Sequence, residues 1–145
     1  FAKNLGIDLV INPNDDNFLE SVRKITDGKG FDFVVEAAGL VETIELGFKI
    51  TKQNGGECIF GSHPKYGEKI KLDPFELISG KKIRGSWGGN SILDRDINYL
   101  SNLIVKNSSI IKKIISNPYP LEDINSALKD LEEKKINRAI IKMKH

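Results

Sequence analysis

Three short apolar runs of this chain end in glycine-containing stretches that could bring a peptide backbone close to a ligand. The runs are Phe33-Val34-Val35-Glu36-Ala37-Ala38-Gly39, Cys58-Ile59-Phe60-Gly61 and Ile83-Arg84-Gly85-Ser86-Trp87-Gly88-Gly89. Helical patterns separate them, so the sequence predicts a strand, a glycine turn and a helix in repetition. In an open parallel sheet, ligands bind outside the carboxyl ends of the strands. The chemistry that these residues suggest is therefore ligand binding by main-chain atoms and small side chains.

Residue types that could act as a nucleophile or a metal ligand are few. Cys58 is the only cysteine and lies inside an apolar run, which predicts a buried and inert thiol. His63 stands beside Pro64 and His145 ends the chain, so no Cys/His cluster has metal-ligand spacing. We therefore assign no catalytic and no metal-binding residue to this chain. The GxGxxG phosphate-binding fingerprint is also missing.

Charge and hydropathy exclude two classes of partner. The 22 basic and 20 acidic residues give a net charge of +2 and are spread along the sequence. No basic block is long enough to follow a phosphate backbone, so we expect no nucleic-acid partner. The apolar stretches are far shorter than the ~20 residues that cross a bilayer, so we expect no membrane partner and a cytoplasmic location.

The elements that must position the three runs follow from hydrophobic periodicity. Alternation of strands and helices in one domain favours right-handed crossovers and a parallel sheet. The expected elements before and between the runs are a strand at Leu9-Val10-Ile11-Asn12, a helix with the stripe Phe18, Leu19, Val22 and Ile25, a helix with Val41, Ile44 and Phe48 on one face, and a brief helix that begins at Pro74.

The pattern changes beyond Gly89. A longer amphipathic helix is expected over residues 92–106 because its apolar side chains recur at steps of three and four. The chain then breaks at Asn117-Pro118-Tyr119-Pro120. A last helix over residues 121–135 and a closing strand over residues 139–143 follow.

The order and separation of several short segments resemble the C-terminal part of zinc-dependent alcohol dehydrogenases of the medium-chain dehydrogenase/reductase superfamily. The resemblance covers essentially the whole chain. The segments that carry it are Gly6-Ile7-Asp8, Ile11-Asn12-Pro13, Gly30-Phe31-Asp32, Glu36-Ala37-Ala38-Gly39, Gly55-Gly56, Gly61, Ser79-Gly80-Lys81-Lys82-Ile83-Arg84-Gly85-Ser86 and Ile136-Asn137-Arg138-Ala139.

The resemblance implies an α/β fold with a partial Rossmann-like, NAD(P)-binding parallel sheet. The family's sheet has six strands in the order 3-2-1-4-5-6, of which this chain would supply the third to the sixth and lack the first two. Residues 1–88 would then be the C-terminal portion of the NAD(P)-binding domain. Residues 89–145 would be a C-terminal helix-strand segment of the catalytic domain.

The resemblance also implies ten cofactor-binding residues. Three groups line the cofactor cleft, and Arg138 matches an arginine that pairs with the pyrophosphate, a role that suits a planar and permanently charged cation. On pattern alone, the glycines could be plain strand-end turns, Trp87 a core or interface aromatic and Arg138 a solvated cation. The three groups that the resemblance assigns to the cofactor cleft are Ala37, Ala38 and Gly39 on the adenosine side, Phe60, Gly61 and Ser62 near the nicotinamide and its ribose, and Ser86, Trp87 and Gly88 at the carboxamide.

The function implied is hydride transfer between an alcohol and NAD or NADP, with zinc polarising the substrate oxygen. The zinc ligands would lie outside this chain, so the chain alone is expected to be inactive and to bind NAD weakly or not at all. The substrate of the parent protein would be a small alcohol or carbonyl compound. Two alternatives remain open: a zinc-free quinone or enoyl reductase of the same superfamily, and a non-enzymatic nucleotide-binding or oligomerisation module.

Association is expected as well. Without the family's first two strands, the strand at Phe33 has an exposed edge, and exposed edges pair with other chains. The family also forms dimers through its sixth strand, here near residues 83–87. We therefore expect a homodimer or a higher oligomer.

Overall fold

The computed structural model describes residues 1–115 and 117–143. The chain forms two compact units. One unit is Ile11–Ser91, and the other joins Phe1–Val10 to Ile92–His145.

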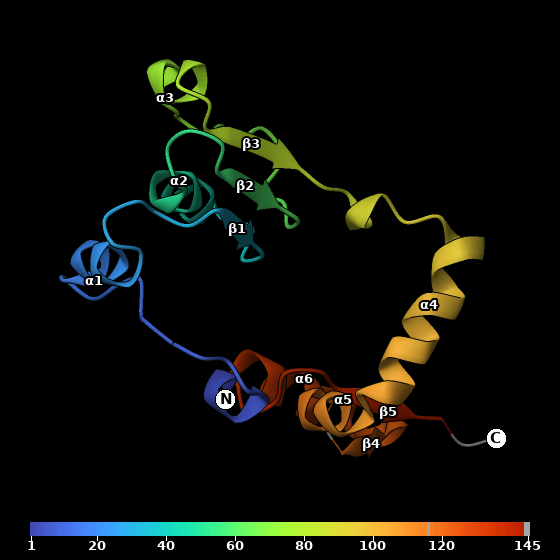
Figure 1. The fold of residues 1–145 in the computed structure, drawn as a ribbon. Coiled ribbons are helices and arrows are strands. Elements are labelled where there is room, and N and C mark those ends of the chain that lie inside the picture. The colour runs from blue at the N-terminus through green and yellow to red at the C-terminus, as the bar shows by residue number, and fades with distance from the viewer. Residues whose placement is uncertain (116, 144–145) are drawn as a thin grey trace. The chain divides into compact units, whose positions relative to one another are not determined.

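A three-stranded parallel sheet forms the centre of the unit Ile11–Ser91. Its strands are β1 (Phe33–Glu36), β2 (Glu57–Phe60) and β3 (Lys82–Gly85), adjacent in the order β1-β2-β3. Figure 1 shows the three arrows side by side, all pointing the same way. The sequence prediction of a parallel sheet in an α/β fold is confirmed. Strands β1, β2 and β3 lie in the order that the resemblance predicts for the fourth, fifth and sixth strands of the family's sheet.

The helices of this unit follow the predicted periodicity. They are α1 (Phe18–Ile25), α2 (Val41–Ile50) and α3 (Pro74–Ile78). Helix α2 packs on β1 and β2 and buries Ile44 and Phe48 against the sheet, where Cys58 is also buried. The Asp73 carboxylate accepts a hydrogen bond of 2.8 Å from the Phe75 N–H, and Pro74 opens α3, where its missing N–H costs nothing.

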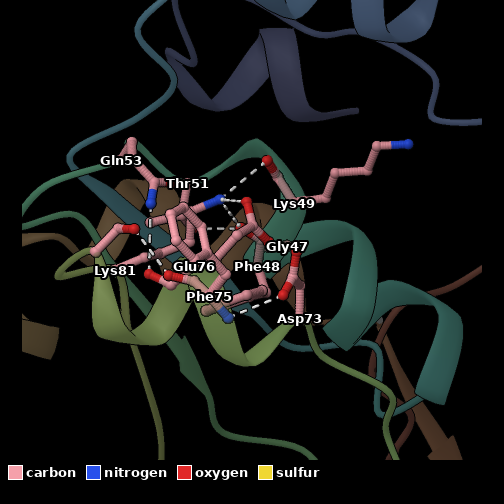
Figure 2. A network of polar contacts seen from close by, with 10 residues as sticks. Gly47, Phe48, Lys49, Thr51, Gln53, Asp73, Phe75, Glu76 and Lys81 are labelled. Atoms are coloured by element: carbon pink, nitrogen blue, oxygen red, sulfur yellow. Dashed lines mark hydrogen bonds and ion pairs between the residues drawn. The ribbon is translucent and has the colours of Figure 1, made fainter.

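A buried lysine ties the end of α2 to α3 and β3. The Lys81 ammonium donates to the carbonyls of Phe48 (3.1 Å) and Lys49 (3.5 Å) and pairs with Glu76 Oε1 at 2.7 Å. It also lies over the Phe48 ring, 4.9 Å from its centroid. Figure 2 shows these contacts meeting at one point, with the Lys49 side chain directed away from them. The last carbonyls of a helix lack partners within the helix, so the ammonium satisfies groups that burial would otherwise leave unpaired.

The strand expected at Leu9-Val10-Ile11-Asn12 is not formed. These residues have no regular secondary structure, and Leu9 and Val10 are exposed. Strand conformation is stabilised by hydrogen bonds to a neighbouring strand, and no strand in residues 1–115 or 117–143 pairs with this segment. A short apolar run alone therefore does not make it a strand.

The described part of the second unit contains five helical segments, two of them 3₁₀ turns, and a small sheet. Its elements are η1 (Ala2–Leu5), α4 (Leu93–Lys106), α5 (Ser108–Ile114), β4 (Pro118–Pro120), η3 (Leu121–Asp123), α6 (Ile124–Glu132) and β5 (Ile140–Lys142), while the turn η2 (Gly88–Asn90) belongs to the first unit.

Strands β4 and β5 pair in parallel and make this second, two-stranded sheet. The closing strand is therefore confirmed, but the segment Pro118–Pro120, expected only as a break in the chain, is a strand. Proline lacks an N–H donor, so it is tolerated in a two-stranded sheet where each strand is an edge. Among the described residues, no helix has the length and apolar character to cross a bilayer.

Candidate functional site

The carboxyl ends of the three parallel strands lie in register at one edge of the sheet. Glu36, Phe60 and Gly85 are the last residues of β1, β2 and β3 and are paired across the sheet. The ladder continues beyond them, because the Gly61 N–H donates to the Glu36 carbonyl (3.0 Å) and the Ser86 N–H to the Phe60 carbonyl (2.9 Å). We call the chain segments at these strand ends tips: residues 37–39 are the first tip, residues 60–62 the second and residues 85–89 the third. The three tips, each with a glycine predicted from the sequence, are thus neighbours.

The first tip, residues 37–39, is held by the carboxylate of Glu36. Glu36 Oε1 accepts hydrogen bonds from the N–H groups of Ala38 (2.7 Å) and Gly39 (2.8 Å) and from the Thr43 hydroxyl (2.7 Å). The other oxygen, Oε2, is also buried and has no hydrogen-bond partner among the described residues. Three donors therefore converge on one carboxylate oxygen directly behind the tip.

The first and second tips touch. Gly39 has a φ of 75°, and a Cβ at this position would lie 3.0 Å from the Ser62 Cβ and 3.1 Å from the His63 carbonyl oxygen. A side chain there would meet both a strained backbone conformation and a close neighbour. Glycine at position 39 is thus required by the contact between the two tips.

A hollow of about 390 Å³ opens between the second and third tips. It is lined by five of the predicted residues, and the Phe60 ring lies so close to Gly85 that a Cβ there would be 3.1 Å from the ring. Ala37, Ala38, Gly39 and Gly88 lie outside its lining. The predicted residues in the lining are Phe60, Gly61, Ser62, Ser86 and Trp87.

The sequence analysis missed His63, which also lines this hollow. Its ring stacks on the Trp87 ring, with centroids 5.8 Å apart and planes 15° apart. Trp87 is otherwise 83% exposed, so the alternative that Trp87 is a core aromatic is wrong for the described unit. The sequence offers one signal for His63, which is an aromatic side chain directly after the second tip. Its stacking partner Trp87, on the third tip, becomes apparent only when the strands are placed in register.

Arg138 belongs to the other compact unit. Its side chain is exposed in the segment that leads into β5. Its expected contact with a pyrophosphate stays a prediction. The division of the chain into residues 1–88 and 89–145 also stays a prediction.

A second cavity, of about 250 Å³, lies away from the tips, near the start of β1. Residues of α1 and the end of α2 line it, together with Glu76 and Lys81. The Lys81 ammonium already has its partners, so this cavity offers a ligand no free buried charge. The edge with the three tips is the better candidate site.

Metal ligands do not gather in the described part of the chain. Among residues 1–115 and 117–143, no three His, Cys, Asp or Glu side chains are placed to hold a metal ion. Burial, and secondarily the charge of Glu36, raises the pKa of the Cys58 thiol, so this cysteine is kept in its neutral, unreactive form. The described residues therefore do not fit a zinc site.

Three parallel strands with glycine turns at their carboxyl ends define an α/β protein of the open-sheet type, in which ligands bind at this edge. The chain belongs to the family described as zinc-binding dehydrogenase, which residues 1–106 match. It is 28% identical over 145 residues to a class-3 alcohol dehydrogenase of Drosophila melanogaster, covering 97% of this chain and 38% of the fly protein. It is 29% identical over 143 residues to an alcohol dehydrogenase class-2 isozyme 2 of Oryctolagus cuniculus, covering 97% of this chain and 37% of that protein.

Solved structures are similar over nearly the whole chain. A benzyl alcohol dehydrogenase from Acinetobacter calcoaceticus has a TM-score of 0.87 at 26% identity, covering 99% of this chain and 39% of that one. An alcohol dehydrogenase zinc-binding domain protein from Burkholderia ambifaria has a TM-score of 0.86 at 28% identity, covering 99% and 38%. The chain thus spans about 38% of the length of such relatives.

Proposed function

We propose that this chain is the cofactor-binding part of a zinc-dependent alcohol dehydrogenase that uses NAD or NADP. The observation that carries the proposal is the register of Glu36, Phe60 and Gly85, which sets three small-residue tips side by side at the ligand edge of the sheet. Membership of the zinc-binding dehydrogenase family supports it. The substrate we propose for the whole protein is a small alcohol or its carbonyl product.

The chain's residues would bind and orient the cofactor. Residues 37–39 present small side chains to the adenosine half, and the hollow between the second and third tips has the size and the aromatic wall to hold a planar nicotinamide ring. A bound nicotinamide supplies the hydride chemistry. The described residues do not fit zinc, and no step of the proposal passes through a metal held by them.

We further propose that catalysis depends on residues other than those described, and that the chain alone is inactive. Association through the open edges of β1 and β3 is part of the same proposal, because each of these strands is paired only with β2 in the described sheet. The cytoplasmic location and the NAD or NADP choice are left as predictions.

Cofactor binding is testable on the 145-residue chain by titrating a ¹⁵N-labelled sample with NAD and with NADP. We expect amide signals of Gly39, Gly61 and Ser86 to shift, with an affinity in the millimolar range because the sequence has no glycine-rich phosphate-binding turn. A micromolar dissociation constant by calorimetry would contradict the expected weakness. The proposal narrows the expectation of weak or absent binding to weak binding at the tips, so unchanged tip signals with both cofactors would contradict it and favour a module without nucleotide chemistry.

A further inference from the structure

We propose that Glu36 is a positioning residue for the adenosine half of the dinucleotide. It would act through the backbone of Ala38 and Gly39 and make no contact with the ligand itself. This inference rests on the proposed function and names which side chain sets the shape of the first tip.

The Glu36 side chain is buried from solvent but remains in contact with the first tip. It is the last residue of β1, only 6% exposed, and its side chain is on the face of the sheet that packs against α2. The Thr43 hydroxyl, from the first turn of α2, donates to the same oxygen as the two tip amides. Glu36 thus joins the end of the strand, the tip and the start of the next helix.

The hydrogen bonds are of the kind that fixes a backbone. Donors to an ionised carboxylate make shorter and stronger bonds than donors to a neutral acceptor. Since the N–H groups of Ala38 and Gly39 both face Glu36 Oε1, they are turned away from a ligand at the tip. The ligand would instead meet the small exposed side chains of Ala37 and Ala38, whose position is set by these two bonds.

The first tip has little freedom to adopt another shape while Glu36 holds it. The space where Gly39 would carry a Cβ is already closed by Ser62 and the His63 carbonyl. Loss of the carboxylate would free two amides and let the tip move away from the second tip. The nicotinamide hollow would be less affected, because its lining comes from the second and third tips.

The two halves of the cofactor distinguish this role from a merely structural one. ADP-ribose and nicotinamide mononucleotide are each titrated into the ¹⁵N-labelled chain carrying Glu36→Ala, and amide shifts give the dissociation constants. We expect the constant for ADP-ribose to rise about tenfold, equivalent to about 1.4 kcal/mol. We expect the constant for nicotinamide mononucleotide to change by less than about twofold, within the ~0.4 kcal/mol that this ratio represents.

Two conservative variants and one control complete the design. Glu36→Gln keeps an acceptor oxygen for the amides and is expected to restore most of the ADP-ribose affinity, whereas Glu36→Asp carries the charge on a shorter side chain and is expected to resemble Glu36→Ala. Glu57→Gln is the control, because Glu57 opens β2 at the opposite end of the strand and pairs with Arg84 there. It should leave both constants unchanged.

The outcomes separate the inference from the proposed function. Equal weakening of both ligands in Glu36→Ala and Glu36→Asp, with no rescue by Glu36→Gln, would reduce Glu36 to a structural role and overturn the inference. Unchanged ADP-ribose affinity in all three variants would overturn it as well, with the proposed function intact. If the unsubstituted chain binds neither half, the proposed function fails and the inference fails with it.

Discussion

Cys58 illustrates how its surroundings set the chemistry of a single side chain. Its thiol lies fully buried in the middle of β2, beneath α2, where Gly47 leaves room for the sulfur: a Cβ on Gly47 would lie 3.2 Å from Sγ. Burial raises the pKa of the thiol first, and the negative charge of Glu36 raises it further. The folded chain therefore holds the thiol proton more tightly than the unfolded chain does.

This pKa shift predicts a loss of stability at alkaline pH. The contribution of Cys58 is complete below the ordinary thiol pKa of about 8.5 and is lost as the pH rises through the raised value of the folded state. We expect the free energy of unfolding to fall more steeply above about pH 8.5 in the natural chain than in Cys58→Ala. Urea denaturation at several pH values measures both free energies. The variant will be less stable overall because of the cavity it leaves, so the difference in slope is the test. Parallel slopes would contradict the predicted titration.

The Lys81 ammonium acts at the scale of an element, because it closes the C-terminus of α2. It joins the carbonyls of Phe48 and Lys49 to the Glu76 carboxylate of α3 (Figure 2). Removal of one partner from a buried pair leaves the other charge and the helix carbonyls without their donor. The end of α2 is therefore the part of this unit most sensitive to a change at position 81.

We expect Lys81→Met to lower the free energy of unfolding by about 2 kcal/mol. This value is below the usual cost for a fully buried pair because the Glu76 side chain is one third exposed and can be hydrated. Urea denaturation followed by circular dichroism measures it. Lys82→Met is the matched control, because Lys82 is the next residue and is exposed, and it should change stability by less than about 0.5 kcal/mol. Equal effects of the two substitutions would show that Lys81 does not stabilise α2.

Local patterns predicted most elements of the fold. Helix α2 and strand β2 carry their apolar residues at the spacing that their burial requires, so the sequence contains the whole signal. Helix α4 also forms where its apolar spacing predicts it, although none of its residues is buried in the described unit. Strand β4 and the segment at Leu9 depend on pairing with residues far along the chain, which periodicity does not report. The prediction therefore missed a strand that has a partner and proposed one that has none in the described residues.

The candidate site shows the same division. The glycine-containing ends of the three runs, at residues 39, 61 and 85–89, are predicted because a glycine at a strand end is a local signal, and the structure brings these tips together at one edge. The stacking of His63 on Trp87 and the hydrogen bonds from the first tip to Glu36 are tertiary contacts without a sequence pattern of their own. Cofactor binding by any of these residues stays a prediction.

At the scale of the molecule, β1 is the edge strand of the sheet that combines an open edge with an exposed apolar face. No strand of the described residues pairs with its free edge, and on the face opposite α2 the side chains of Phe33 and Val35 are 71% and 72% exposed. An open strand edge beside an apolar face is a site for pairing with another copy of the chain. We expect concentration-dependent association, which light scattering coupled to size-exclusion chromatography measures.

The double variant Phe33→Lys and Val35→Lys tests this surface directly. Lysine on an edge strand opposes pairing by charge repulsion and removes the apolar contact, so we expect smaller assemblies than the natural chain forms at the same concentration. Ile78→Lys is the control, because Ile78 is an apolar residue on α3 that is even more exposed than Phe33 and Val35 and does not belong to β1. Association lost in both variants would mean that general hydrophobicity causes it, and a natural chain that stays monomeric at high concentration would contradict the prediction. Loss in the β1 variant alone would place the contact on β1, because the two variants carry the same kind of substitution on different elements.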